Sequence, residues 1–155
     1  MAEVRSGDGS RGLGARVLAA VGTPDGRISL GRTLWAYGLV RLHLGRDGAP
    51  AAMAWACRPR PGSPADPDAA WAWAHRLVRP GRLPGTCLVR SIVLARVLSV
   101  GHGSPAVRLG VRREGGRLRA HAWVELAGRS YGAHPGFEPL GADARPLPDV
   151  HDPHP

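Results

Sequence analysis

The residue with the clearest capacity for chemistry is Cys87, which stands where a helix is expected to begin. Thr86 fits the N-cap position, the apolar run from Leu88 to Val100 predicts the helix, and Gly101 supplies a stop signal. The first turn of a helix carries unpaired N–H groups and a partial positive charge, which favour thiolate over thiol. Cys87 is therefore a candidate nucleophile, and a nucleophilic thiol needs a base.

The candidate base is His121, which lies in a segment whose apolar residues recur with a period of two. Small and aliphatic side chains share one face of this predicted strand, while His121, Trp123 and Glu125 share the other. A histidine beside a helix-start cysteine can take the thiol proton, hold the thiolate as an ion pair and later protonate a leaving amine. Trp123 follows on the same face and is the candidate substrate-binding residue, as a wall of the groove. The alternative for Trp123, that it simply covers the sheet, stays open.

Neighbouring strands are expected to position this histidine. Alternation from Val107 to Val111 predicts a preceding strand, and Arg129 to Gly132 a third one after the dipeptide Ala127-Gly128. A two-residue turn there would set His121 opposite His134 and beside Ala133. With the cysteine helix, these strands are the elements expected to position the candidate pair.

The chain before residue 87 is expected to be helical and divided by a proline-rich linker. Residues 1–64 are predicted to form a helical segment and this linker, 65–140 a compact core, and 141–155 a proline-rich tail that is mobile or wraps over the surface. The predicted helices cover 13–21, 28–44 and 68–78, the last with Asp66 or Asp68 near its start; the type of 49–57 is left open.

Two segments together resemble a known family. Leu83-Pro84-Gly85-Thr86-Cys87-Leu88-Val89-Arg90-Ser91 and His121-Ala122-Trp123-Val124-Glu125-Leu126 are similar to the transglutaminase-like cysteine peptidases that remove leader peptides in lasso-peptide biosynthesis. The resemblance implies a papain-like or transglutaminase-like α+β core, with Cys87 as nucleophile and His121 as base. It also implies a precursor peptide as substrate, a small leader-binding protein that delivers it, and a cyclase that acts after cleavage.

The sequence departs from the family pattern at Ala133, where the resemblance implies an acidic third catalytic residue. Three residues are available as substitutes. Glu138 ranks first if the segment before it bends back, Glu125 shares the face of His121, and His134 could bond the imidazole without supplying charge. Losing the orienting residue of a triad typically costs several powers of ten in rate and leaves some catalysis.

Composition argues against a nucleic-acid-binding, membrane-spanning or secreted protein. The net charge is +9 and every cationic side chain other than histidine is arginine, but the arginines are scattered and no known nucleic-acid reader appears. No apolar stretch reaches the roughly 20 residues of a membrane span, and the N-terminus lacks the pattern of a signal peptide, so we expect a cytoplasmic protein. In that compartment Cys57 and Cys87 are expected to be free thiols.

The leading hypothesis is thus a cysteine peptidase, with two rivals. One is an inactive scaffold that binds leader or cyclase, motivated by Ala133; the other is an acyltransferase on the same fold. No cofactor is expected, and no metal, because His134, His151 and His154 lack a ligand spacing with a supporting third residue. Arginines on the strands, from Arg108 to Arg119, could attract an acidic leader.

Overall fold

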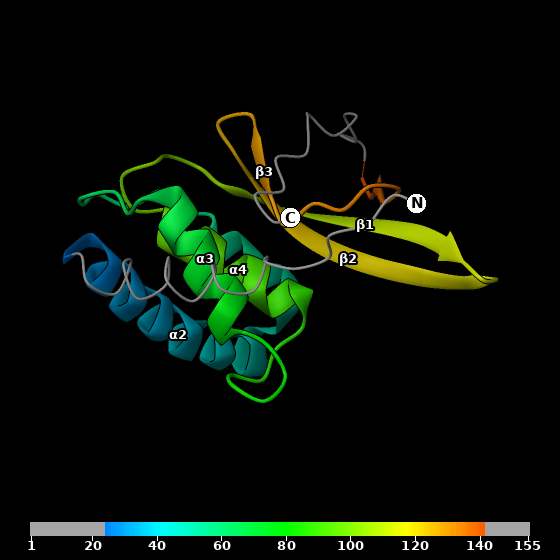
Figure 1. Cartoon of the computed structure of the whole chain (residues 1–155), viewed down its shortest axis with the longest axis horizontal. Coiled ribbons are helices and arrows are strands. Elements are labelled where there is room, and N and C mark those ends of the chain that lie inside the picture. Colours follow the sequence, from blue (N-terminus) through cyan, green and yellow to red (C-terminus); the bar gives the residue numbers. More distant parts are fainter. Residues whose placement is uncertain (1–23, 142–155) are drawn as a thin grey trace, which may run out of the picture.

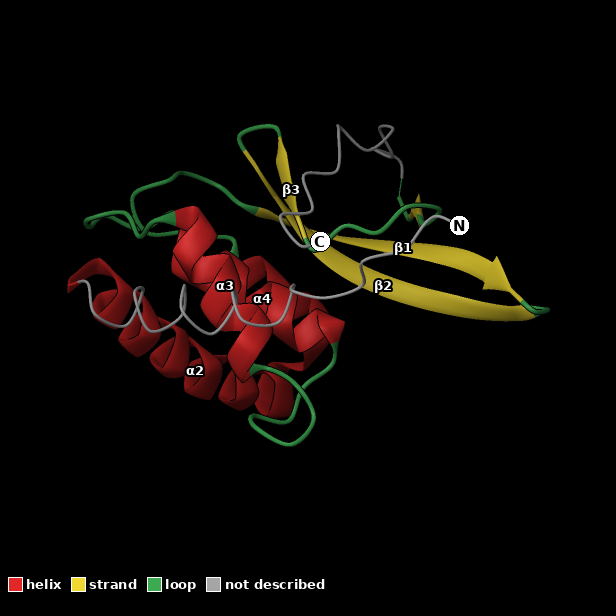
Figure 2. Cartoon of the chain, viewed as in Figure 1, coloured by secondary structure: helices red, strands yellow, loops and turns green. Residues whose placement is uncertain are grey.

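The structure, a computed structural model, describes residues 24–141 and combines a helical layer with a small antiparallel sheet (Figures 1 and 2). Its elements in chain order are α2 (Pro24–Ala56), α3 (Pro67–Leu77), α4 (Cys87–Leu98), β1 (Ala106–Glu114), β2 (Arg117–Leu126), β3 (Arg129–Tyr131) and β4 (Glu138–Pro139). The strands form one sheet in the order β3-β2-β1-β4. This arrangement confirms the α+β class expected from the sequence.

Helix α4 is the centre of the fold, because it is buried along most of its length. Eight of its residues are buried, among them Ile92, Val93 and Leu94, which are fully shielded from solvent. It contacts α2, α3, β1 and β2. Since a helix buried on several sides cannot shift without disturbing the core, its first residue, Cys87, is held firmly relative to the sheet.

Helix α2 belongs to the same hydrophobic core as α4. Ala36, Val40, Ala52 and Ala56 are buried on its inner side and join the central cluster. The sequence predicts the helix to stop at Gly45, whereas the interruption lies at Gly48, whose φ of 78° is non-helical, and helix resumes after it. Residues 49–57, left unassigned from the sequence, are therefore mostly helical.

The two shorter helices begin differently. Asp66 caps α3, and its carboxylate accepts a hydrogen bond from the Ala69 N–H at 2.6 Å. Thr86 occupies the N-cap position of α4 as expected, but its side chain makes no capping hydrogen bond. The first-turn N–H groups of α4 therefore remain available to other partners.

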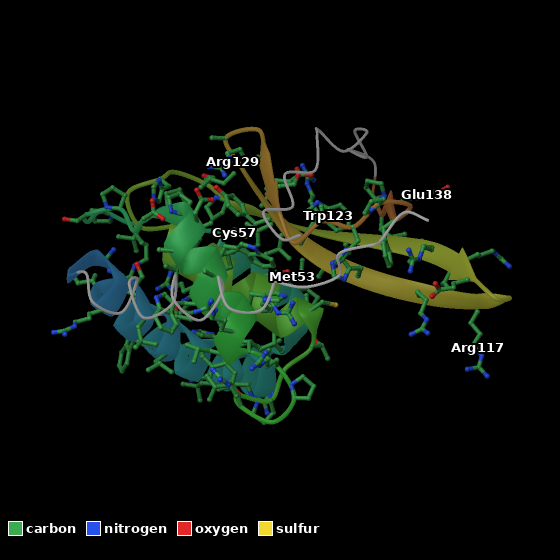
Figure 3. All side chains as sticks on the ribbon, in the orientation of Figure 1. Met53, Cys57, Arg117, Trp123, Arg129 and Glu138 are labelled. Carbon is green, nitrogen blue, oxygen red and sulfur yellow. The ribbon has the colours of Figure 1, made fainter. Side chains whose placement is uncertain are left out.

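The sheet register places His121 where the sequence predicts it. Ala127 and Gly128 both have positive φ, 49° and 80°, and make a two-residue turn that pairs Val124 with Tyr131. Strand β3 ends at Tyr131, so the chain leaves the sheet just before it passes His121. The β1–β2 hairpin, by contrast, runs well beyond the helices (Figure 1), and Figure 3 shows Arg117 pointing away from its tip.

The predicted helix over 13–21 and the tail over 142–155 lie outside the described residues. Within 24–141, no helix is long and apolar enough to cross a membrane.

Candidate active site

Cys87 and His121 meet where the N-terminus of α4 reaches β2. The thiol and the imidazole are hydrogen-bonded to each other, and both side chains are half-buried. This hydrogen bond is the main cause of a lowered pKa for Cys87 and of a raised pKa for His121. Shifts in opposite directions stabilise the thiolate–imidazolium pair, because each charged form is favoured by its partner.

Main-chain donors add to the stabilisation of the sulfur. The N–H groups of Ala122 and Leu88 both lower the pKa of Cys87, against the opposing effect of burial. The first helical hydrogen bond of α4 runs from the Arg90 N–H to the Thr86 carbonyl, so the N–H groups before Arg90 have no partner within the helix. They can therefore donate to the sulfur or to an oxyanion beside it.

The second nitrogen of His121 is held by the main chain. His121 Nε2 lies 2.6 Å from the carbonyl oxygen of Gly132. A carbonyl can only accept, so Nε2 must carry the hydrogen, and in the neutral ring Nδ1 is left as the acceptor for the thiol proton of Cys87. The Gly132 carbonyl thus fixes the ring orientation and the tautomer that a general base at this position needs.

The conformation of Gly132 explains why its carbonyl can take this place. Its φ is 78°, which side-chain-bearing residues rarely adopt, and a Cβ there would lie 2.7 Å from Trp71 Cη2. Trp71 is buried in α3 and belongs to the hydrophobic core. Gly132 is not among the site residues predicted from the sequence; a glycine at the end of the third predicted strand is the signal that could have indicated it.

The acidic substitutes considered from the sequence do not reach His121. Glu125 is bonded to Arg108 at 3.0 Å and to the Trp123 indole N–H at 3.3 Å. Glu138 pairs with Val111 across β1 and β4, whereas His121 pairs with Gly110. Paired residues share a face of the sheet, so Glu138 projects from the opposite face, and the expectation that it returns to the imidazole is wrong.

His134 is the only one of the three substitutes that lies against His121. Their ring centroids are 4.7 Å apart in an edge-on arrangement, and Phe137 packs on His121 at 5.2 Å. Ala133 itself is buried, with 4% of its surface exposed. Two aromatic rings and the Gly132 carbonyl therefore contact the imidazole of His121.

The structure corrects the interpretation of Trp123. Its side chain is fully buried, and its ring lies so close to Gly110 that a Cβ there would be 2.8 Å away. A side chain without exposed surface cannot form the wall of an open groove. Trp123 therefore covers the sheet, which is the alternative that the sequence left open.

The two cysteines differ in their surroundings. Both are free thiols, as expected. Burial raises the pKa of Cys57, whereas the pKa of Cys87 is lowered.

Among the described residues no group of three His, Cys, Asp or Glu side chains could hold a metal ion; His151 and His154 lie outside these residues.

Comparison with known proteins agrees with this geometry at the level of the family. The family model described as "Transglutaminase-like superfamily" matches residues 31–140, well over half of the chain, and runs from within α2 to β4. The match thus begins within α2, before the linker. No curated protein and no solved structure matches the chain. The chain belongs to the transglutaminase-like superfamily.

Proposed function

We propose that this protein is a cysteine peptidase that removes the leader peptide from a ribosomally synthesised lasso-peptide precursor. The observation that carries the peptidase chemistry is the hydrogen-bonded Cys87–His121 pair, with Gly132 holding the far side of the imidazole. The substrate class rests on the resemblance of the two segments around these residues to lasso-peptide leader peptidases. A leader-binding protein and a cyclase are the partners that this pathway requires.

The proposed reaction begins with the thiolate of Cys87, which attacks the carbonyl carbon of the scissile peptide bond. The negative charge that develops on the carbonyl oxygen is placed to accept hydrogen bonds from the free N–H groups of the first α4 turn. The imidazolium of His121 donates its Nδ1 proton to the leaving amine, so the C–N bond breaks and a thioester forms. Water, deprotonated by His121, then attacks the thioester and releases Cys87 as thiolate.

The main argument for the rival hypothesis, an inactive scaffold, is weakened by the position of the Gly132 carbonyl. It depends on Ala133, since an imidazole without a partner on its second nitrogen is poorly oriented. Gly132 supplies such a partner at 2.6 Å. A carbonyl lacks the full charge of a carboxylate, so we expect a slower enzyme than one with an acidic third residue.

The decisive experiment incubates the purified chain with a precursor peptide and its leader-binding protein, and follows the products by mass spectrometry. Cleavage that adds the mass of water and disappears in Cys87→Ala supports the proposal, with Cys57→Ala as the matched control that keeps activity. Cleavage that persists in Cys87→Ala refutes it. A product that retains an added amine instead identifies an acyltransferase.

A further inference from the structure

A concave site lies between α2 and α4, away from Cys87. It is a pocket of about 200 Å³. Its lining residues are Arg32, Trp35, Ala36, Arg60, Arg96, Val97 and Val100. Arg96 and Val97 stand near the C-terminal end of α4, about 15 Å along the helix axis from Cys87 at its start. A ligand in this pocket would therefore not touch the sulfur.

The pocket is lined by positively charged side chains, and no acidic residue among the described ones lines it. Three of its lining residues are arginines and none of the described ones is acidic. Arg32 uses Nη1 for a hydrogen bond to the Ser63 carbonyl at 2.9 Å. Arg96 stacks its guanidinium 4.0 Å from the Trp55 ring, and its Nε is buried without a hydrogen-bond partner among the described residues.

Arg60 and Arg96 are also close enough to repel each other. Besides burial, which is the larger effect, the charge of Arg60 lowers the pKa of Arg96. Two like charges, and a buried donor without a partner among the described residues, cost free energy. A carboxylate placed between the guanidiniums would relieve the repulsion, because it supplies the opposite charge and accepts hydrogen bonds from the guanidinium groups.

The surface beside the pocket is apolar and elongated. Trp35 is 70% exposed, and Ile28 and Leu42, seven residues to either side along α2, are 51% and 61% exposed. Residues spaced by seven lie on the same side of a helix, so the three form a line about 20 Å long. Figure 1 shows α2 at the outer edge of the helical layer. Such a line is too long for a small anion and fits a peptide.

We propose that the pocket binds an acidic peptide segment of a partner protein, with a carboxylate between Arg60 and Arg96 and apolar side chains on Ile28, Trp35 and Leu42. Charge complementarity selects the acidic segment, and the exposed apolar line selects one that also carries apolar residues. The proposal goes beyond the peptidase function and does not depend on it, because the pocket and Cys87 lie at opposite ends of α4.

The test uses the full chain labelled with ¹⁵N and observes the arginine Nε–H signals by NMR. The probe is the capped peptide Leu-Glu-Phe-Leu-Glu, and its counterpart with glutamine in place of glutamate is the uncharged control. We expect the acidic peptide to shift the Arg96 signal and the glutamine peptide to leave it in place. Affinity should fall at least tenfold in Arg60→Gln and in Arg96→Gln.

Matched variants separate binding from folding and from general charge. Arg46→Gln removes one positive charge from a side chain that is 81% exposed and outside the pocket, so affinity should change less than twofold. Arg60 is held by main-chain hydrogen bonds to Ser99 and Gly101, so Arg60→Gln keeps the fold even if Arg96→Gln does not. Cys87→Ala should bind the probe as the unmodified chain does, which keeps this result separate from the peptidase test.

Three outcomes would overturn the proposal. The first is an Arg96 signal that the acidic peptide leaves unshifted. The second is an equal shift with acetate at the same carboxylate concentration, which would mean that the pocket binds any small anion. The third is a shift of the Arg96 signal in Glu3→Gln/Asp8→Asn without added peptide, which would mean that the chain's own N-terminal segment is the occupant.

Discussion

Replacing Gly132 by alanine should uncouple His121 from its main-chain partner. A methyl group at this position meets Trp71 Cη2 at 2.7 Å, and the residue has a φ of 78°. An alanine in the left-handed region costs about 1–2 kcal/mol even without a clash. Trp71 is packed in the core and cannot withdraw cheaply, so the peptide after β3 must move and carry the Gly132 carbonyl away from Nε2.

The size of the effect follows from the hydrogen bond that is lost. A hydrogen bond to a charged group contributes about 1.5–3 kcal/mol. The Nε2–H of His121 donates to this carbonyl in both the neutral and the charged ring, so only the difference between a charged and a neutral hydrogen bond counts, about 1–1.5 kcal/mol. Losing the bond therefore shifts the equilibrium from the ion pair toward the neutral thiol and imidazole by roughly 5- to 10-fold. The pKa of His121 falls and that of Cys87 rises, which weakens the shifts of the unmodified protein without reversing them, because the hydrogen bond between Cys87 and His121 is their main cause.

The assay measures thiolate absorbance near 240 nm against pH, together with the rate of alkylation of Cys87 by iodoacetamide. Gly128→Ala is the matched control, because Gly128 has a φ of 80° but no atom within 4 Å of the place that a Cβ would take. It imposes the same backbone strain without the contact to Trp71. If Gly132→Ala and Gly128→Ala titrate alike, the Gly132 carbonyl does not set the ionisation of the pair.

Three further predictions follow from individual contacts. Alkylation near neutral pH should modify Cys87 in preference to Cys57, since the pKa of Cys87 is lowered and that of Cys57 is raised; equal rates in a peptide map would contradict this. Ala133→Asp should raise kcat/KM less than tenfold, because Nε2 already has an acceptor; a larger gain in rate would show that the carbonyl is a poor substitute. The same substitution should lower the free energy of unfolding by about 1–3 kcal/mol, because it buries a carboxyl group. Asp66→Ala should cost about 1 kcal/mol in urea unfolding and Thr86→Ala close to nothing, because Asp66 makes its capping bond and Thr86 does not; equal losses would refute this difference.

The elements that present the candidate pair could be predicted because each follows from local sequence. Thr86 and the apolar run after it mark the start of α4, and the small turn residues Ala127 and Gly128 fix the register of β3 on β2. The neighbourhood of His121 can therefore be located from the sequence alone. Both predictions depend on residues close together in the chain.

What the sequence did not predict depends on tertiary contacts. Gly132 acts through its main chain, and Trp71, whose ring leaves no room for a side chain at this position, lies some sixty residues earlier. The burial of Trp123 depends on Gly110 of β1, where the absence of a side chain leaves room for the indole ring. The length of α2 was underestimated because Gly45 resembles a stop, whereas packing on α4 sustains the helix up to Gly48 and again beyond it.

The Gly132 carbonyl also bears on how the protein responds to acid. A carboxylate in the third position would have its own protonation step, and losing its charge at low pH would release the imidazole. An amide carbonyl has no such step, so it remains an acceptor for Nε2 across the whole acid range. The acid side of any rate profile should then report the Cys87–His121 pair alone. Among natural variants we would therefore expect the glycine at position 132 and the tryptophan beside it to be retained. An acidic residue at the third position would be under less constraint.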